Sequence, residues 1–232
     1  MSAELSPVLR RRIIRDGLSV GVATGGYALA VGAAAATAGL GTAKASALSI
    51  VMFTGGSQFA LVSVVASGGS AAAALSVAWL LGARNGLYSF RLRDTLPAPI
   101  GRRVGAAHFV IDESMAMSIV RADPAEARLA FWATGLSIFV LWNLGTLIGA
   151  LATHLVADPN RYGLDVAFPA AFLALIWPHI RHAPAIVTAL GAAAIALMLI
   201  PLAPAGVPIL ASAFGAGLGM ATARRGTPEV HP

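Results

Sequence analysis

The chain has 232 residues, of which 57% are hydrophobic and only 11% are charged, and its mean hydropathy is +0.78. Because soluble domains carry about a quarter charged residues, this composition excludes an ordinary soluble domain and predicts an integral membrane protein. The net charge of +6 does not indicate nucleic-acid binding, since the basic residues cluster at the ends of apolar segments, as they do on cytoplasmic membrane flanks.

The beginning of the chain is polar and basic, and we expect residues 1–16 to form a cytoplasmic N-terminal tail. The apolar run that follows continues to Ala43, which is too long for the apolar region of a secretory signal, and it lacks a clean cleavage signature. We therefore expect a retained membrane span. Residues 17–223 are predicted to form a single transmembrane transport domain, and residues 224–232 a cytoplasmic C-terminal tail.

Apolar segments then follow one another along the chain. They are Leu18–Leu40, Ser46–Ala66, Ala71–Leu87, Val104–Val120, Leu129–Leu151, Val166–Ile180, Ala185–Pro201 and Val207–Ala223. A helix needs about 20 residues to cross a bilayer, so the shorter segments are weak candidates for crossing. The pattern predicts an all-α integral membrane protein with about six full transmembrane helices and two interrupted or re-entrant segments.

The second segment contains Phe53-Thr54-Gly55-Gly56-Ser57-Gln58-Phe59, a polar and flexible patch in a stretch without charge. In a dry bilayer, an unwound backbone or a Gln amide needs protein, ions or a solute as partners. The positive-inside rule also favours an interruption here. If the N-terminal arginines and the loop Arg91–Arg103 are both cytoplasmic, an even number of crossings separates them, although three apolar segments lie between. We expect this segment to re-enter, with Gly55-Gly56 at its tip.

The same parity argument predicts that Val104–Val120 does not cross either, and that the loop around Asp158, Asn160 and Asp165 lies outside. Pro201–Pro208 is then the short outer turn between the last two spans. Two halves with one interrupted segment each are typical of secondary transporters, where half-helix ends bind solute and ions near the midplane. Because we detect no internal sequence identity, an inverted repeat is a conjecture from topology.

Four motifs point to a family. They are Gly55-Gly56-Ser57-Gln58-Phe59, Arg84-Asn85-Gly86-Leu87-Tyr88, Asp112-Glu113-Ser114 and Leu144-Gly145-Thr146-Leu147-Ile148-Gly149-Ala150. In this order and spacing the chain resembles the AzlC-type branched-chain amino acid permeases, from about Arg15 to Arg225. The family pattern around Gln58 is usually Gly-Ala-Ala-Gln-Phe. It usually has arginine and histidine where Arg84 and Asn85 stand, and commonly asparagine at the place of Gly82.

The resemblance implies the large subunit of a two-component exporter in the bacterial plasma membrane. Its partner would be a small AzlD-like membrane subunit, and its substrates valine, leucine and isoleucine. The expectation that the protein exports its substrate comes from the resemblance alone. The departures at Gly82 and Asn85 leave open a different small anionic or amphipathic solute.

Residue chemistry independently predicts a site for a zwitterion. The start of a half-helix presents free backbone N–H groups to a carboxylate, and Gly56, Ser57 and Gln58 follow the expected break. Phe53 and Phe59 are candidates for the walls around an aliphatic side chain. The full set of predicted substrate-binding residues is Gly55, Gly56, Ser57, Gln58, Phe59, Arg84, Tyr88 and Asn143. Close helix packing through small residues is the alternative for the glycines.

Arg84 and Tyr88 lie one helical turn apart, so they face the same side, where Arg84 attracts a carboxylate. The alternative is that Arg84 extends to the headgroups with Arg91 and Arg93, and that Tyr88 belongs to an interfacial aromatic belt. Asn143 lies in the middle of an uncharged run, and interhelical hydrogen bonding explains it as well as substrate contact does.

Asp112, Glu113 and His108 are the candidates for ion coupling, with His108 and Asp112 predicted on one helical face. A carboxylate there binds the substrate ammonium or cycles through protonation. The alternative is an interfacial helix whose acidic residues meet water or Arg102-Arg103.

Catalysis is not expected. The sequence lacks the zinc-hydrolase, serine-hydrolase, dinucleotide and Walker A motifs, cysteine is absent, and the histidines have no metal-ligand spacing. No cofactor is predicted, and energy is expected from an ion gradient, a partner or the solute gradient. A noncatalytic membrane scaffold or channel subunit, whose glycines serve packing alone, is the competing interpretation.

Overall fold

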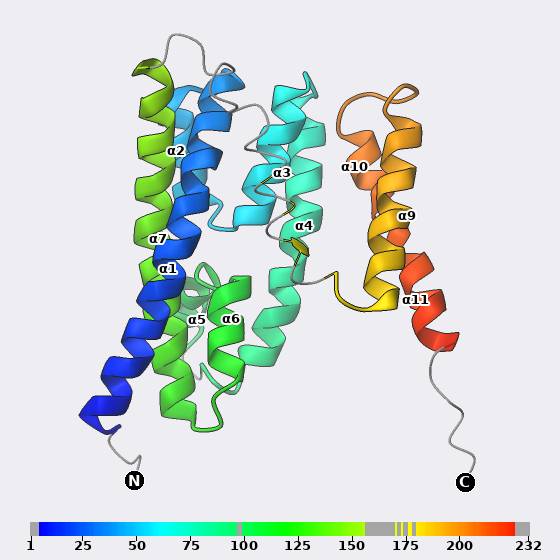
Figure 1. Ribbon diagram of the computed structural model, residues 1–232. Coiled ribbons are helices and arrows are strands. Elements are labelled where there is room, and N and C mark those ends of the chain that lie inside the picture. The colour runs from blue at the N-terminus through cyan, green and yellow to red at the C-terminus, as the bar shows by residue number, and fades with distance from the viewer. Residues whose placement is uncertain are drawn as a thin grey trace, which may run out of the picture.

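The computed structural model describes residues 5–96, 99–155 and 180–225, together with positions 170, 173, 176 and 177. Within these parts every regular element is a helix (Figure 1). The helices are α1 (Pro7–Thr37), α2 (Gly41–Val51), α3 (Gly55–Ala66), α4 (Ala71–Leu92), α5 (Ile100–Ala107), α6 (Asp112–Ile119), α7 (Pro124–Leu155), α9 (Ala183–Leu199), α10 (Val207–Ser212) and α11 (Gly215–Arg225).

The two longest helices, α1 and α7, have 31 and 32 residues and run parallel, side by side. Each is about 47 Å long, which exceeds the roughly 30 Å hydrocarbon core of a bilayer. Both are long and apolar enough to cross a membrane. Since α1 begins at Pro7, residues 7–16 of the predicted N-terminal tail are the first turns of this helix.

Small residues allow α1 and α7 to approach closely. A Cβ built on Gly17 would lie 3.0 Å from the backbone nitrogen of Thr134, and one on Gly21 would lie 2.7 Å from Ser137 Oγ. The Ser137 hydroxyl also donates a hydrogen bond of 2.8 Å to the Gly17 carbonyl. Gly-mediated contact of this kind is a common way to hold membrane helices together.

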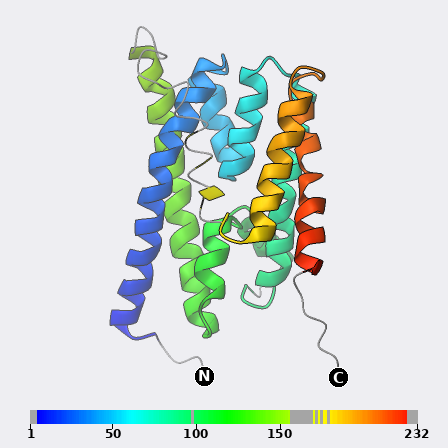
Figure 2. The same ribbon diagram turned by 45° about the vertical axis from the view of Figure 1, so that its right-hand side comes forward.

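The first interrupted segment is a pair of half-helices. The chain turns back after α1, descends through α2, breaks at residues 52–54 and returns through α3 (Figures 1 and 2). The expected interruption is therefore present. The tip lies at Met52–Thr54, whereas Gly55 and Gly56, which were expected to form it, begin α3.

A second pair of half-helices, α5 and α6, lies at the opposite end of the molecule (Figure 1). Residues 108–111 separate them, and α6 then runs antiparallel to the start of α7, where Ser118 Oγ donates to the Ala127 carbonyl over 3.0 Å. The prediction that His108 and Asp112 share one helical face is wrong, because His108 caps the end of α5 and Asp112 begins α6.

The two breaks meet halfway along α7. The Phe53 ring lies 5.8 Å from the His108 ring, 6.0 Å from the Phe109 ring and 5.1 Å from the Phe139 ring, measured between centroids. Phe139 stands near the middle of α7, so two half-helix pairs from opposite ends touch at the centre of the molecule. Aromatic contact of this kind favours one fixed arrangement of the two tips.

The C-terminal helices form an antiparallel hairpin, in which α9 packs against α10 and α11 (Figure 2), and α10 also contacts α4. A turn is present at Pro201–Gly206, within the predicted Pro201–Pro208, and Val207 and Pro208 already belong to α10. The segment Val207–Ala223 is interrupted by a turn at residues 213–214, so it is not one continuous helix as predicted. None of the α9 residues is buried in the protein, as expected for a helix that faces lipid or a partner.

The predicted number of six spans is not established. Two helices meet the length and apolarity expected of a span, α4 has 22 residues and α9 has 17. Most of the predicted segment Val166–Ile180, and all three of Asp158, Asn160 and Asp165 from the predicted outer loop, fall outside the described residues.

Candidate functional site

An ion pair between α4 and α6 lies next to the two breaks. Arg84 Nη2 lies 2.6 Å from Asp112 Oδ2, and the Tyr88 hydroxyl donates a 2.8 Å hydrogen bond to Asp112 Oδ1. The structure thus places Arg84 and Tyr88 on one side of α4, as predicted, and joins them to a predicted coupling residue. Asp112 pairs with Arg84 and not with Arg102 or Arg103.

The guanidinium of Arg84 also lies against the first turn of α3. A Cβ built on Gly56 would be 3.1 Å from Arg84 Nη2, so a side chain at this position would require a small shift of the guanidinium. The first N–H groups of a helix have no partner inside the helix, and those of Gly55, Gly56 and Ser57 have no acceptor among the described residues. Because α6 begins at Asp112, two positive helix ends lie beside the ion pair, which makes the region attractive to anions.

Buried polar atoms without hydrogen-bond partners gather in the same region. Among the described residues, five of the seven such atoms belong to the neighbourhood of α3, α4 and the middle of α7. They are Ser57 Oγ, Gln58 Nε2, Arg84 Nε, Asn85 Oδ1 and Asn143 Oδ1. Buried polar groups are almost always hydrogen-bonded in folded proteins, so a concentration of unpaired ones favours a site that water or a polar solute completes.

Gln58 is completely buried and reaches α7. Its Oε1 accepts a 2.6 Å hydrogen bond from Trp142 Nε1, while Phe59, also completely buried, meets the Trp142 ring edge-on at 6.3 Å. Gly55 lies against the same indole, since a Cβ there would be 2.7 Å from Trp142 Cη2. For Gly55 this geometry favours the packing role. Gln58 Nε2, in contrast, is a buried donor without an acceptor among the described residues.

A cavity of about 710 Å³ reaches the first break. Its described lining combines Met52 and Thr54, from the break, with one side of α4 that includes Gly82 and Ala83. Thr54 directly precedes the free N–H groups of α3, and Ala83 directly precedes Arg84. Neither Gln58 nor Arg84 is among the described lining residues, although the Arg84 side chain is 40% exposed.

The remaining predicted residues have separate surroundings. Asn143 Nδ2 donates to the Phe139 carbonyl of its own helix over 2.7 Å. The His108 ring packs among Phe53, Phe109 and Phe139. Glu113 is partly buried and forms no ion pair within the described ranges.

No cluster that suits a metal ion is formed by the residues that the structure describes. Within them, no three side chains of His, Cys, Asp or Glu come together. His108 stands among aromatic rings, and the carboxylate of Asp112 is held by Arg84 and Tyr88.

The model of the family described as AzlC protein matches residues 19–156. The chain belongs to the AzlC family. An uncharacterized membrane protein from Archaeoglobus fulgidus is 30% identical over 184 residues, which make up 78% of this chain and 80% of the relative. No solved structure matches the chain.

The AzlC match extends from α1 to α7 and includes every predicted site residue, whereas α9 to α11 lie beyond it. AzlC proteins form a permease-type membrane family related to branched-chain amino acid transport, and not an enzyme family. This AzlC chain is therefore a membrane protein with a transport-related role.

Sequence reasoning missed how the AzlC site is connected. It assigned Arg84 to the solute carboxylate and Asp112 to the substrate ammonium or to proton coupling, without pairing the two, and it gave Trp142 and Asn85 no role. One signal was available, because charged side chains within apolar membrane segments usually pair with one another. The Trp142–Gln58 hydrogen bond had no comparable signal, since nothing in the spacing of the two residues brings them together.

Proposed function

We propose that the protein is a membrane transporter subunit that exports branched-chain amino acids, works with a small AzlD-like subunit and uses an ion gradient. The observation that carries the proposal is the Arg84–Asp112 pair, which lies beside the first turn of α3 and among unpaired buried polar atoms. Discontinuous helices with charged groups between them are the arrangement by which secondary transporters hold small charged solutes.

In the proposed mechanism, the amino acid carboxylate replaces Asp112 on Arg84. The carboxylate accepts hydrogen bonds from the free N–H groups at Gly56 and Ser57, where the helix end also favours negative charge. Asp112, released from Arg84, then pairs with the ammonium group. A charged solute is in this way neutralised at both ends by groups that neutralise each other when it is absent.

The apolar side chain of the solute is proposed to lie in the cavity beside the break. That cavity is lined by Met52 and by apolar residues of α4, and burial of a leucine-sized side chain is worth roughly 1.5–3 kcal/mol. Amino acids with small or charged side chains gain less from such a surface, so it favours valine, leucine and isoleucine.

The two half-helix pairs support alternating access. They enter from opposite ends and meet at Phe53 and His108, so separation of either pair from the centre opens the site toward one end only. We propose that Glu113, next to Asp112 and without an ion pair in the described residues, takes up the coupling proton. The N-terminus and the basic end of the bundle are proposed to be cytoplasmic.

The test is transport in proteoliposomes that contain the chain with and without the small subunit. We expect efflux of labelled valine that requires both proteins and falls when the proton gradient is collapsed. Arg84→Ala removes the carboxylate site, and Arg91→Ala, an exposed arginine on the same helix, is the matched control. Equal valine flux in empty liposomes, wild type and Arg84→Ala would contradict the proposal.

A scaffold or channel subunit is the second candidate. The Gly55–Trp142 contact favours it, because this glycine serves packing. The two candidates differ in the need for Arg84, since a scaffold requires the fold but no carboxylate site. Wild-type transport by a well-folded Arg84→Ala variant would therefore favour the second candidate.

A further inference from the structure

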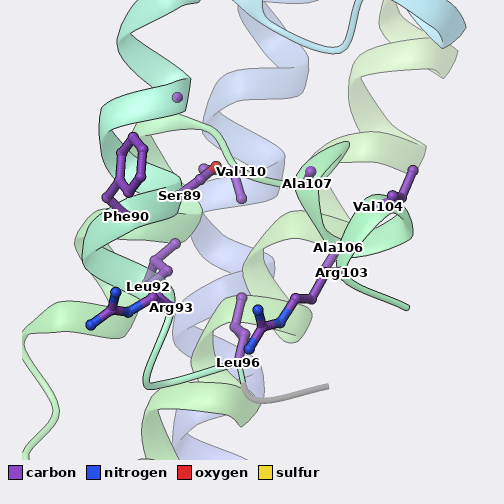
Figure 3. Close-up of a pocket in the computed structure, with 11 residues that line it drawn as sticks. Ser89, Phe90, Leu92, Arg93, Leu96, Arg103, Val104, Ala106, Ala107 and Val110 are labelled. Atoms are coloured by element: carbon purple, nitrogen blue, oxygen red, sulfur yellow. The ribbon is translucent and has the colours of Figure 1, made fainter. Parts of the chain in front are cut away.

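A second cavity lies between the last turns of α4 and α5 (Figure 3), and it shares one lining residue, Gly86, with the cavity proposed for the solute. Its volume is about 320 Å³, and its walls are largely apolar, with Phe90 and Leu92 from α4 and Val104 and Ala106 from α5. Phe90 is 76% exposed and Val104 is 69% exposed, so the rim itself is apolar and faces outward. An opening of this kind is suited to a hydrocarbon chain and not to a free ion.

Two arginines from different elements stand at one end of this cavity. Arg93 follows α4 and Arg103 belongs to α5, and Figure 3 shows both side chains at the end where Leu96 lies. Within the described residues, Arg93 is paired only with Asp94, at 3.4 Å in an exposed position where an ion pair contributes little. Arg103 has no acidic partner among the described residues. The cavity therefore combines apolar walls with available positive charge.

The position of the cavity agrees with a lipid leaflet. Arg91 and Arg102 lie at the same end of α4 and α5, and α1 begins with Arg10, Arg11 and Arg12 toward the same end of the molecule (Figure 1). Basic pockets between membrane helices at the cytoplasmic surface are a recognised setting for anionic headgroups.

We propose that this cavity binds an anionic phospholipid. Its phosphate lies between Arg93 and Arg103, and one acyl chain lies along Phe90, Leu92, Val104 and Ala106. A phospholipid satisfies both features at once, whereas a free phosphate leaves the apolar walls in contact with water and a neutral lipid leaves the two arginines without a counter-charge. The inference does not depend on which solute the protein carries.

The site also has a structural consequence. The α5 half-helix is capped by His108, whose ring contacts Phe53 at the other break, so a lipid between α4 and α5 supports one side of the second half-helix pair.

The test is lipid binding by the purified full-length protein after delipidation. Phosphatidylglycerol and phosphatidylcholine with the same acyl chains are added to each protein, and bound lipid is counted by native mass spectrometry. Each arginine near a lipid headgroup is worth about 1 kcal/mol, which is roughly a fivefold change in affinity. We expect wild type to prefer phosphatidylglycerol, and the double variant Arg93→Gln/Arg103→Gln to bind it about 25-fold more weakly.

Two further variants distinguish the contribution of the headgroup site from that of the apolar wall and from a general effect of net charge. Arg91→Gln/Arg102→Gln removes the same charge from exposed arginines that do not line the cavity, and we expect it to keep the preference. Gly86→Leu places a side chain where a Cβ meets nothing within 4 Å and where the cavity wall lies, so it is expected to weaken binding of both lipids. Equal binding of the two lipids by wild type, or equal loss in both arginine pairs, would overturn the proposal.

Discussion

Arg84 Nη2 lies 2.6 Å from Asp112 Oδ2. This ion pair joins the long helix α4 to the first residue of α6, a half-helix at the end of the molecule opposite to α2 and α3 (Figure 1). The pair is partly exposed, and its Arg84 side also contacts the start of α3 at Gly56. Three elements that are separate in sequence therefore converge on one guanidinium. The consequences can be measured residue by residue.

Replacement of Arg84 tests the carboxylate site. A hydrogen bond to a charged group contributes about 1.5–3 kcal/mol, so we expect Arg84→Ala to reduce valine transport roughly 10- to 100-fold. Arg84→Lys keeps the charge but loses the two-pronged geometry, and it is expected to retain part of the activity. Labelled valine efflux at several substrate concentrations is the measurement. Full activity of Arg84→Ala would mean that the solute carboxylate binds elsewhere.

Gly55 tests packing at the start of α3. A Cβ at this position would lie 2.7 Å from Trp142 Cη2, so Gly55→Ala is expected to destabilise the protein by about 1–3 kcal/mol. Gly86→Ala is the matched control, because its Cβ meets nothing within 4 Å and alanine is the better helix former. Thermal unfolding in detergent compares the two. A Gly55→Ala variant as stable as Gly86→Ala would contradict the close contact between this glycine and the indole.

The hydrogen bond from Trp142 to Gln58 is buried, and its loss leaves a polar group without a partner. We expect Gln58→Leu to cost about 1–3 kcal/mol, and Trp142→Phe to cost at least as much because it also removes ring area. If the two residues act through one bond, the double variant loses less stability than the sum of the single changes. Strict additivity in unfolding experiments would show that the hydrogen bond contributes nothing.

The contact between the two breaks can be tested by cross-linking. The natural chain has no cysteine, so an introduced pair reacts without background. Phe53→Cys with His108→Cys is expected to be joined by a short, membrane-permeable thiol cross-linker, because the two native rings lie 5.8 Å apart. Phe53→Cys with Arg121→Cys is the control, since Arg121 follows the end of α6 that is remote from the break, where it contacts Asp16 and Glu126. Cross-linking of both pairs to the same extent would argue against a defined meeting of the tips.

The sequence was sufficient to predict the first interruption, because glycines, a buried amide and the distribution of arginines all favoured a break between Ser46 and Ala66. The tip was predicted at Gly55-Gly56, whereas it lies just before them in the sequence, at Met52–Thr54. The prediction assigns glycine to the point of the turn, whereas in the structure Gly55 and Gly56 begin a helix that packs closely on Trp142 and Arg84. Local flexibility does not distinguish these two uses of glycine.

The second break was harder to predict. Parity indicated that Val104–Val120 is a partial segment, interrupted or re-entrant, but residues 108–111 include neither glycine nor proline, so the position of the break was not predicted. Its interruption is fixed by tertiary contacts of Phe109 with α7 and by Ser114, whose hydroxyl accepts from the Ile111 N–H and donates to the Phe109 carbonyl. The link between Arg84 and Asp112 likewise depends on how distant segments fold together.

The long helix α4 is attached differently from α1 and α7. Those two are fastened to each other by glycines along their length, whereas α4 packs mainly on α3, with smaller contacts to α6 and α10. A displacement of α4 therefore moves both half-helix pairs, because Arg84 of α4 contacts α3 at Gly56 and α6 at Asp112. Helices α1 and α7 stay fixed to each other during such a movement.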